Sequence, residues 1–422
     1  MTEFNIRIFT SGCRLNQAEE EEILENFYKY GGRLSSSYAD VCVINTCTVT
    51  SNADRKSRAL IRKVKKLFPS SLIVITGCYA TTDFEKLKKD FSDAIIIPNS
   101  EKNIIAQKVL PMLTLRKTKN ENIFLTNKIF LPQRYRSRFF LKIQSGCDEK
   151  CSYCKVRIAR GKSTSVPLRS IVEKVLKASE KYEEIVLTGV NLLSWKDDKK
   201  NFADLMNILC NLKIPVRYRL SSMEPMMISD EILDTLKDPK ICDHFHICFQ
   251  SGDSSVLSLM NRDPETDRFF YIVEKLRKMR SDAAIGADLI VGFPGESDKS
   301  FENTLNLVRD LRISHLHLFR YSKREGTIAS FLTDTVPENI IDERYNILLS
   351  VGEENKKKFI LSMAEKVFSF VKEHSTFLSS NYISAYPPPL IKLKNERLVK
   401  GRLKISDNMK VYIYPLEKGE NL

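Results

Sequence analysis

Three cysteines within eight residues constrain this 422-residue chain more than any other feature. Cys147, Cys151 and Cys154 have the spacing C-x3-C-x2-C, so a single loop can direct all three thiols at a common point. A four-iron cluster normally has four Cys thiolates, and a loop with three leaves one iron open to a small molecule. The alternatives are a structural zinc knuckle or reduced bystander thiols. No nearby His completes a zinc ligand set, so the spacing favours an iron–sulfur cluster.

The first 128 residues alternate between strand and helix patterns. Apolar residues alternate in the segment 4–8, and the first helix is expected to begin at Asn16, with Glu19 completing a capping box. Further buried strands are expected at residues 41–45, 72–76 and 94–97. Strands that alternate with helices at this spacing predict an α/β fold with a doubly wound parallel sheet.

Three further cysteines come just after the predicted strands. Cys13, Cys47 and Cys78 are 34 and 31 residues apart, which is about one strand–helix unit each. Loops at the carboxyl ends of parallel strands lie along one edge of a sheet, where ligands bind. The three thiols are therefore predicted to meet in a second iron–sulfur site, with structural zinc as the alternative. Cys42 lies inside a strand pattern and is predicted to be a small core residue.

A polar and basic stretch, residues 116–138, is predicted to connect a first domain (1–128) to a second (129–355). Six strands separated by helical patterns are expected in the second domain, at residues 138–144, 185–188, 215–220, 244–250, 285–291 and 315–321. Six strand–helix units predict a partial, open (β/α)6 barrel. In barrels of this kind, the chemistry takes place at the carboxyl ends of the strands.

Glycines and polar residues follow these strands in succession. These strand-end motifs are residues 188–191, 221–225, 250–252, 288–296 and 320–326. Each motif alone is compatible with ordinary turn chemistry, but their succession on one face of the barrel predicts a ligand site beside the three-cysteine loop. Other eye-catching residues are interpreted as structural, namely His244, His246, His315, His317, Cys210, Cys242 and Cys248.

The formal net charge of +14 is clustered along the chain. Residues 54–66 hold seven Lys or Arg against one acid, and residues 155–169 hold five and no acid. Such patches predict a polyanionic partner, most simply a nucleic acid, whereas solvated helix faces are the alternative interpretation. The end of the chain is basic as well. After a charged helix expected to run from residue 337 to about 358, short alternating runs predict a small β module at residues 356–422.

The cysteine motifs resemble those of the radical S-adenosylmethionine (SAM) methylthiotransferases. The matching stretches are residues 11–17, 45–50, 76–79 and 147–154. Residues 14–17 and 53–58 look most like the branch that acts on N6-threonylcarbamoyladenosine in tRNA. The resemblance covers at least residues 5–330. It implies that the C-terminal module is of the RNA-binding TRAM type, although that match is loose.

The resemblance also implies the cofactors and the reaction. Two [4Fe–4S] clusters are expected, one on Cys147, Cys151 and Cys154 and one on the three upstream cysteines. SAM is expected to bind the first cluster and to start radical chemistry at C2 of the adenosine. Gly189 and Asn191 would lie near its amino end, Glu224 and Gln250 near its sugar and methionyl part, and Gly292 beside its adenosyl group. The implied partners are tRNA and a low-potential electron donor of flavodoxin or ferredoxin type, whereas the sulfur source is left open.

Two other functions are compatible with the sequence. One is the same chemistry on isopentenylated adenosine or on an aspartate of a ribosomal protein. The other is a non-catalytic, metal-stabilised RNA-binding protein. The ten cysteines, the absence of a secretory signal at the start and the shortness of the apolar runs predict a cytoplasmic protein that does not enter a membrane.

Overall fold

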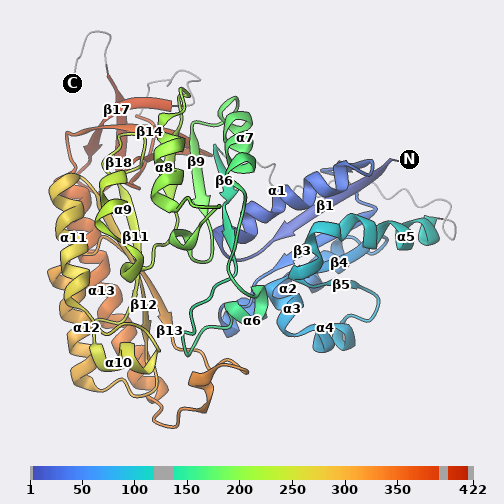
Figure 1. The fold of residues 1–422 in the computed structure, drawn as a ribbon, viewed down its shortest axis with the longest axis horizontal. Helices are drawn as coiled ribbons and strands as arrows, with labels where there is room; N and C mark the ends of the chain where they lie inside the picture. The colour runs from blue at the N-terminus through green and yellow to red at the C-terminus, as the bar shows by residue number, and fades with distance from the viewer. Residues whose placement is uncertain (1–2, 118–136, 389–397, 417–422) are drawn as a thin grey trace.

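The computed structural model describes residues 3–117, 137–388 and 398–416. It contains an N-terminal parallel sheet, a six-stranded partial barrel and a C-terminal antiparallel sheet (Figure 1). The predicted three-part α/β architecture is therefore confirmed. Most of the predicted linker lies outside the described residues, between the end of α5 and the start of β6. The predicted boundary near residue 355 falls inside helix α13 (Glu338–Ser362), so the domain boundaries stay a prediction.

The N-terminal sheet has five parallel strands in the order β2-β1-β3-β4-β5. Helices α1 and α5 cover one face, and α2, α3 and α4 cover the other, so the sheet is doubly wound. The short strand β2 was not predicted from the sequence. The elements are β1 (Phe4–Thr10), α1 (Arg14–Tyr28), β2 (Gly32–Leu34), β3 (Val41–Thr46), α2 (Ser51–Leu67), β4 (Leu72–Gly77), α3 (Cys78–Thr82), α4 (Phe84–Asp90), β5 (Ile95–Ile97), η1 (Asn99–Ile104) and α5 (Ile105–Lys117).

The barrel strands form two parallel three-stranded sheets, β6-β9-β10 and β11-β12-β13. Single bridges between Tyr218 and Ile241 and between Met223 and Ile247 join the two sheets. The strands are β6 (Arg138–Lys142), β9 (Glu184–Thr188), β10 (Arg217–Leu220), β11 (His244–Gln250), β12 (Ala284–Val291) and β13 (His315–Arg320). All six strand predictions are thus confirmed, and the two sheets together make the expected partial barrel.

Helices cover the outer side of the barrel (Figure 1). Apolar residues of α7, α8, α9, α11, α12 and α13 pack with alternate strand residues in one large core. The α-helices of this part before α13 are α6 (Val156–Arg160), α7 (Leu168–Ser179), α8 (Phe202–Asn211), α9 (Asp230–Thr235), α10 (Ser254–Leu259), α11 (Asp267–Met279) and α12 (Asp298–Asp310). The strands β7 (Gln144–Ser145) and β8 (Thr164–Ser165) form a separate two-stranded antiparallel sheet. Within the described residues, every helix is too short or too polar to span a bilayer.

The C-terminal module is an antiparallel sheet in the order β16-β15-β14-β17-β18. Its strands are β14 (Val367–Glu373), β15 (Thr376–Ser379), β16 (Ser384–Ala385), β17 (Leu398–Ile405) and β18 (Val411–Pro415). The module is anchored to the barrel by Arg217 and Arg219, which pair with buried Glu184 and donate hydrogen bonds to backbone carbonyls of the module. Because both arginines belong to strand β10, buried charged side chains join the barrel to the module.

Candidate iron–sulfur and SAM site

The three upstream cysteines lie at the carboxyl ends of three neighbouring strands. Cys13 precedes α1, Cys47 follows β3 directly, and Cys78 is the first residue of α3 after β4. Because the strand order reverses between β1 and β3, the thiols of Cys13 and Cys47 flank the point where ligands bind in open α/β sheets. The structure thus brings together residues that are 34 and 31 positions apart in the chain.

Two glycines permit this close approach. Gly12 and Gly77 each precede a cysteine and have φ values of +99° and +100°. A Cβ at Gly12 would lie 2.7 Å from the Cys47 Sγ, and one at Gly77 would lie 2.3 Å from the Thr46 carbonyl oxygen. Any side chain at either position would therefore push the strand-end loops apart.

Asn16 has a different role from the predicted one. It lies inside α1, so the prediction of a helix cap at this residue was wrong. Its buried side chain instead donates hydrogen bonds of 2.9 Å to the carbonyls of Ser11 and Thr46. A cap would need the side chain at the start of the helix, whereas here it joins the loop before Cys13 to the strand before Cys47.

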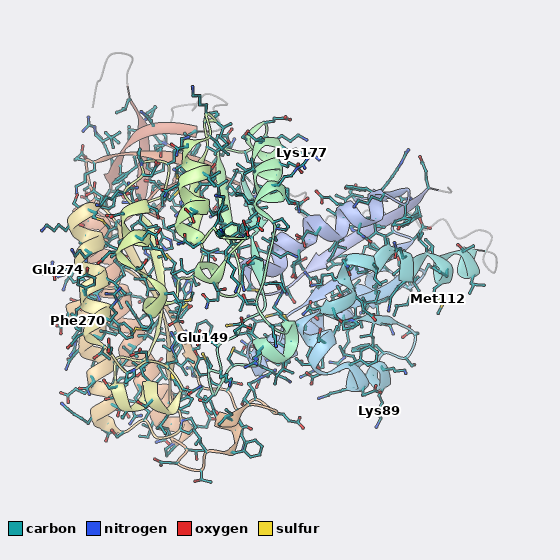
Figure 2. The ribbon with its side chains drawn as sticks, in the orientation of Figure 1. Lys89, Met112, Glu149, Lys177, Phe270 and Glu274 are labelled. Carbon is teal, nitrogen blue, oxygen red and sulfur yellow. The ribbon has the colours of Figure 1, made fainter. Side chains whose placement is uncertain are left out.

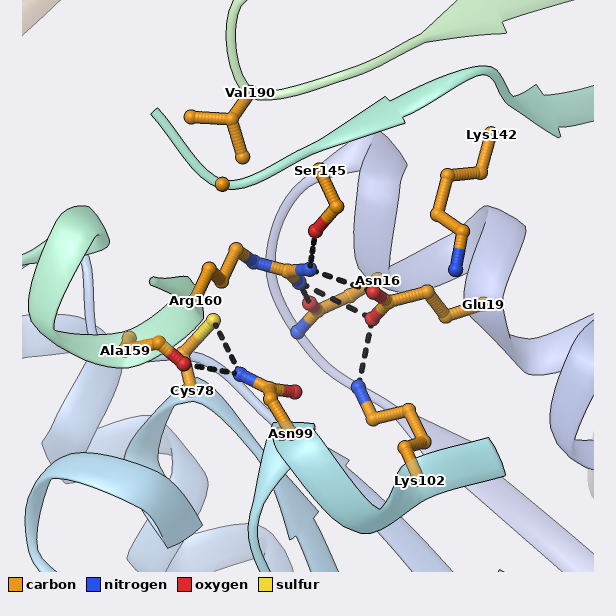
Figure 3. A network of polar contacts seen from close by, with 12 residues as sticks. Asn16, Glu19, Cys78, Asn99, Lys102, Lys142, Ser145, Ala159, Arg160 and Val190 are labelled. Atoms are coloured by element: carbon orange, nitrogen blue, oxygen red, sulfur yellow. Dashed lines mark hydrogen bonds and ion pairs between the residues drawn. The ribbon is translucent and has the colours of Figure 1, made fainter. Parts of the chain in front are cut away.

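A buried polar network connects this site to the barrel (Figure 3). Arg160, at the end of α6, donates to the carboxylate of Glu19 at 2.6 and 3.1 Å and to Asn16 Oδ1 at 2.6 Å. The ammonium of Lys102 lies 2.7 Å from the same carboxylate. Burial alone would raise the pKa of Glu19, but Lys102 and Arg160 outweigh it and hold the pKa well below its usual range.

Asn99 completes the connection on the other side of Cys78. Its side-chain amide lies 3.6 Å from the Cys78 Sγ and donates a 2.9 Å hydrogen bond to the carbonyl of Ala159 (Figure 3). Helix α6, which follows Cys154 within two residues, packs against α3, which begins with Cys78. The contact between these two helices therefore joins a segment of one cysteine site to a segment of the other.

The loop with Cys147, Cys151 and Cys154 is held at several backbone points. The amide of Cys147 donates to the Gly161 carbonyl at 3.1 Å. The amide of Ser152 donates to the Met260 carbonyl, and the Ser152 carbonyl accepts from the amide of Ala329, both at 2.8 Å. Glu149, in the same loop, lies near the centre of the molecule in Figure 2. These bonds tie the loop to the end of α6, to the end of α10 and to the segment that follows β13.

Arg262 is a site residue that the sequence reasoning missed. Its guanidinium donates to both carboxylate oxygens of Glu224 at 2.5 and 2.7 Å and approaches the Cys151 Sγ at 3.8 Å. It also donates to the carbonyl of Cys248 at 2.8 Å. A buried positive charge beside Cys151 stabilises a thiolate there, so Arg262 fits a ligand that binds metal in its anionic form. No local motif marks this arginine.

Gln144 organises the predicted ligand loop after β9. Its Oε1 accepts hydrogen bonds from the amides of Val190 and Asn191 at 2.9 and 3.0 Å, and its Nε2 donates to the Gly146 carbonyl at 2.7 Å. A Cβ at Gly189 would lie 2.9 Å from the same Oε1, which explains the glycine. Gln144 therefore ties the predicted SAM-binding loop to the loop that carries Cys147.

Asn191 offers a direct test of whether a ligand fits. Its side chain is buried, and within the described part of the chain its Oδ1 has no hydrogen-bond partner. A buried acceptor without a partner costs free energy unless a ligand or water satisfies it. This orphaned oxygen therefore fits the predicted contact with the amino end of SAM.

The other three predicted SAM contacts lie nearby in different settings. Burial raises the pKa of Glu224, against the effect of its partner Arg262. Gln250 ends β11 with φ at +66°, a strained backbone of the kind found at ligand sites. Gly292 is buried under α13, where a Cβ would lie 2.4 Å from Ile341. That glycine has a packing reason, and its contact with the adenosyl group stays a prediction.

Cysteines bind metal as thiolates, whether the metal is zinc or the iron of a cluster. Burial raises the pKa of Cys47 and of Cys154 to about 11, so these thiols keep their protons until a metal displaces them.

The remaining cysteines and histidines occupy the positions that the sequence predicted, in strands and helices. Cys42, Cys210 and Cys242 are buried, and Cys248 lies 3.3 Å from a carboxylate oxygen of Asp288. His244 stacks on Tyr382 of the C-terminal module, with ring centroids 4.3 Å apart. The interpretation of all of them as structural residues stays a prediction.

Further contacts fix the N-terminal sheet against the barrel. Arg324, after β13, forms an ion pair of 2.7 Å with Asp54 and donates to the carbonyl of Thr48 at 3.0 Å. Lys155, directly after Cys154, lies 3.2 Å from a carboxylate oxygen of Asp83. These residues come from segments next to Cys47, Cys78 and Cys154, so the two sites are held in a defined relative position.

Two family models match the chain. Residues 141–308 match the radical SAM superfamily, and residues 5–97 match a family described as the uncharacterized protein family UPF0004. Among solved structures, a radical SAM methyltransferase from Kitasatospora setae, TsrM, has a TM-score of 0.55 with 12% identity and covers 75% of this chain and 73% of its own. At that identity the likeness shows the shared fold alone.

Curated relatives match most of the chain. "Threonylcarbamoyladenosine tRNA methylthiotransferase MtaB" of Aquifex aeolicus is 34% identical over 390 residues, which is 89% of this chain and 94% of the relative. The protein of that name from Bacillus subtilis is 33% identical and covers 88% and 85%. "tRNA-2-methylthio-N(6)-dimethylallyladenosine synthase" of Endomicrobium trichonymphae is also 33% identical, over 83% and 84%. The chain belongs to the radical SAM methylthiotransferase family.

Proposed function

We propose that this enzyme adds a methylthio group to C2 of N6-threonylcarbamoyladenosine in tRNA. The observation that carries the proposal is a pair of three-cysteine sites that the α3–α6 contact joins. Cys78 of one site begins α3, and Cys154 of the other lies two residues before α6. Relatives that share about a third of the sequence over most of the chain carry the corresponding name. The family's cofactors are two [4Fe–4S] clusters and SAM.

The residues present fit these cofactors. Cys147, Cys151 and Cys154 would hold one cluster and Cys13, Cys47 and Cys78 the other. When bound, these groups supply radical chemistry at C2 and the sulfur and methyl that are transferred. The chain's own residues position them. Arg262 places positive charge beside Cys151, and Asn191 presents a buried acceptor that has no partner among the described residues.

The surface next to Cys47 fits a tRNA. Helix α2 begins four residues after this cysteine, and most of its basic residues are exposed, namely Arg55, Lys56, Arg62, Lys63 and Lys66. Exposed Lys400 and Lys404 on β17 add positive charge to the C-terminal module. Backbone phosphates are the natural partners of such residues. A low-potential electron donor of flavodoxin or ferredoxin type remains part of the proposal, and so does the use of the C-terminal module as an RNA grip.

The decisive experiment compares tRNA nucleosides from cells with and without the protein by mass spectrometry. Loss of the methylthio form of N6-threonylcarbamoyladenosine in the deletion strain is expected. If that nucleoside persists and the methylthio form of isopentenyladenosine disappears instead, the substrate is the one named for the other group of relatives. If both persist, the ribosomal-protein aspartate becomes the substrate to examine.

A further inference from the structure

Three polar residues on neighbouring barrel strands form a cluster that the proposed chemistry leaves unused. They are His246 on β11, Asp288 on β12 and His317 on β13. His246 Nε2 lies 2.8 Å and His317 Nδ1 lies 3.3 Å from the same oxygen, Asp288 Oδ1. Asp288 and His317 are directly paired in the strand register. The cluster is therefore set by the sheet itself and not by a loop.

The cluster lies on the inner face of the barrel. Residues that alternate with it, such as Phe245, Ile247 and Leu289, pack in the core beneath the outer helices. Since side chains alternate between the two faces of a strand, His246, Asp288 and His317 point to the opposite, inner side. In barrels of this kind the chemistry takes place at the carboxyl ends of the strands, and Asp288 lies three residues before the end of β12 at Val291.

Gly286, which has no side chain, leaves room for the cluster. A Cβ at Gly286 would lie 2.5 Å from His246 Nδ1, so the imidazole lies across this glycine and reaches Asp288. The second oxygen of Asp288 accepts from the Cys248 thiol at 3.3 Å. Burial would raise the pKa of Asp288, but His246 and His317 outweigh it and lower the pKa. The carboxylate thus orients both rings.

His317 is the member of the cluster that a ligand can reach. Its side chain is 53% exposed, against 3% for His246 and 17% for Asp288. Because Nδ1 is directed at Asp288, Nε2 lies on the opposite side of the ring, and it makes no hydrogen bond to any residue that the structure describes. The protein therefore orients this imidazole and leaves one nitrogen available.

The cluster adjoins the cysteine site. The carbonyl of Cys248 accepts the hydrogen bond from Arg262, whose guanidinium also contacts Glu224 and the Cys151 Sγ. One residue, Ile247, separates His246 from Cys248, and the Cys248 thiol lies 3.3 Å from a carboxylate oxygen of Asp288. A nucleotide whose base lies at the strand ends would thus have a substituent within reach of this inner face.

We propose that His317, oriented by Asp288, is the hydrogen-bonding subsite for the N6 substituent of the substrate, an inference that rests on the proposed function. When Nδ1–H of His317 donates to Asp288, the hydroxyl or the urea N–H of the threonylcarbamoyl group can donate to Nε2, and its carboxylate can accept from Nε2–H when the ring is protonated. A dimethylallyl group carries no polar group and would leave Nε2 of His317 without a hydrogen bond to the substrate. Sites built to hydrogen-bond a substrate discriminate strongly against analogues that lack the polar group.

The test uses the reconstituted enzyme and two tRNAs of identical sequence, one with N6-threonylcarbamoyladenosine and one with N6-dimethylallyladenosine at the same position. His317→Phe should lower kcat/KM for the first tRNA about 10- to 100-fold, mainly through KM, while SAM cleavage continues. His317→Gln, which keeps a hydrogen-bonding group, should recover most of the loss. Asn306→Phe, a change at an exposed polar residue on the outer helix α12, serves as the matched control.

The outcomes separate this inference from the proposed function. Wild-type enzyme that does not convert the threonylcarbamoyl tRNA refutes the function. Wild-type enzyme that converts it, with an unchanged preference between the two tRNAs in His317→Phe, refutes the subsite alone. One mononuclear metal per chain, lost in both His317→Phe and Asp288→Asn, would also overturn the subsite, because the cluster would then be a metal site.

Discussion

The two three-cysteine sites are built in different ways, although both are expected to hold the same kind of cluster. The loop of Cys147, Cys151 and Cys154 is local, and eight consecutive residues contain all its thiols. The site of Cys13, Cys47 and Cys78 is assembled by the sheet, from three strand ends that only the fold brings together. A local site depends on its loop, whereas an assembled site depends on packing far from the thiols.

The largest expected effect comes from the local site. Cys151→Ala should abolish SAM cleavage and leave about four of the roughly eight iron atoms per chain. The measurements are iron analysis after anaerobic reconstitution and assay of 5′-deoxyadenosine. Cys242→Ala, at a buried cysteine outside both sites, is the control and should keep all the iron. Surviving SAM cleavage in Cys151→Ala would show that the loop does not hold the catalytic cluster.

The assembled site should fail in a different way. Cys47→Ala is expected to lose about half of the iron, like Cys151→Ala, but to keep SAM cleavage while forming no methylthio product. Because the two sets of cysteines lie in separate segments that are joined by the α3–α6 contact and by side-chain contacts, the loss of one cluster should leave the fold around the other intact. If Cys47→Ala loses SAM cleavage as completely as Cys151→Ala, the two sites are not separable, and the comparison drawn above is wrong.

The connection between the sites can be broken without touching a thiol. Arg160→Gln should cost about 3–5 kcal/mol of unfolding free energy, because the buried carboxylate of Glu19 loses one of its two charged partners. Denaturant unfolding measures the loss. Arg169→Gln, which removes an exposed i,i+4 ion pair of α7, should cost less than about 0.5 kcal/mol. Equal costs in the two variants would show that the network does not stabilise the contact.

The same network has a predicted pH dependence. The pKa of Glu19 is lower in the folded chain than its ordinary value of 4.5, so its contribution to stability is present above pH 4.5 and is lost as the pH falls below it. Arg160→Gln should flatten this part of the pH–stability curve, since the pKa of Glu19 then moves back toward its ordinary value. Unfolding measured from pH 6 down to about pH 3 on metal-free protein tests this. An identical acid slope in both proteins would contradict it.

The smallest effect isolates close packing at the assembled site. Gly77 and Gly161 have similar backbones, with φ/ψ of 100°/−168° and 73°/−158°, that only glycine adopts readily. Ala at Gly77 would also clash with Thr46, whereas nothing lies within 4 Å of a Cβ at Gly161. Gly77→Ala should therefore cost about 1–3 kcal/mol more than Gly161→Ala and should lose iron from the assembled site. Equal costs would mean that the strand ends can move apart.

Sequence reasoning predicted the parts of this molecule that have a regular signature. Strand periodicity located all six barrel strands, and the positions of the cysteines after strands placed them at one edge of the sheet. It failed at Asn16, where the capping-box pattern was real but the side chain bonds a neighbouring loop. It also missed Arg262, because the residues that this side chain contacts are far from it in the sequence and leave no local pattern. Contacts between distant segments determine both residues, and a linear pattern does not encode them.

The contact between Arg14 and Tyr382 has a consequence for biosynthesis. The guanidinium next to Cys13 donates a 2.9 Å hydrogen bond to a hydroxyl that lies 368 residues later in the chain. A ribosome releases this tyrosine only when nearly all of the protein has been made, since synthesis runs from the N-terminus. This contact beside Cys13 therefore forms late, after the segments that carry all six predicted cluster cysteines have been made. The C-terminal module closes one side of the surroundings of Cys13 last.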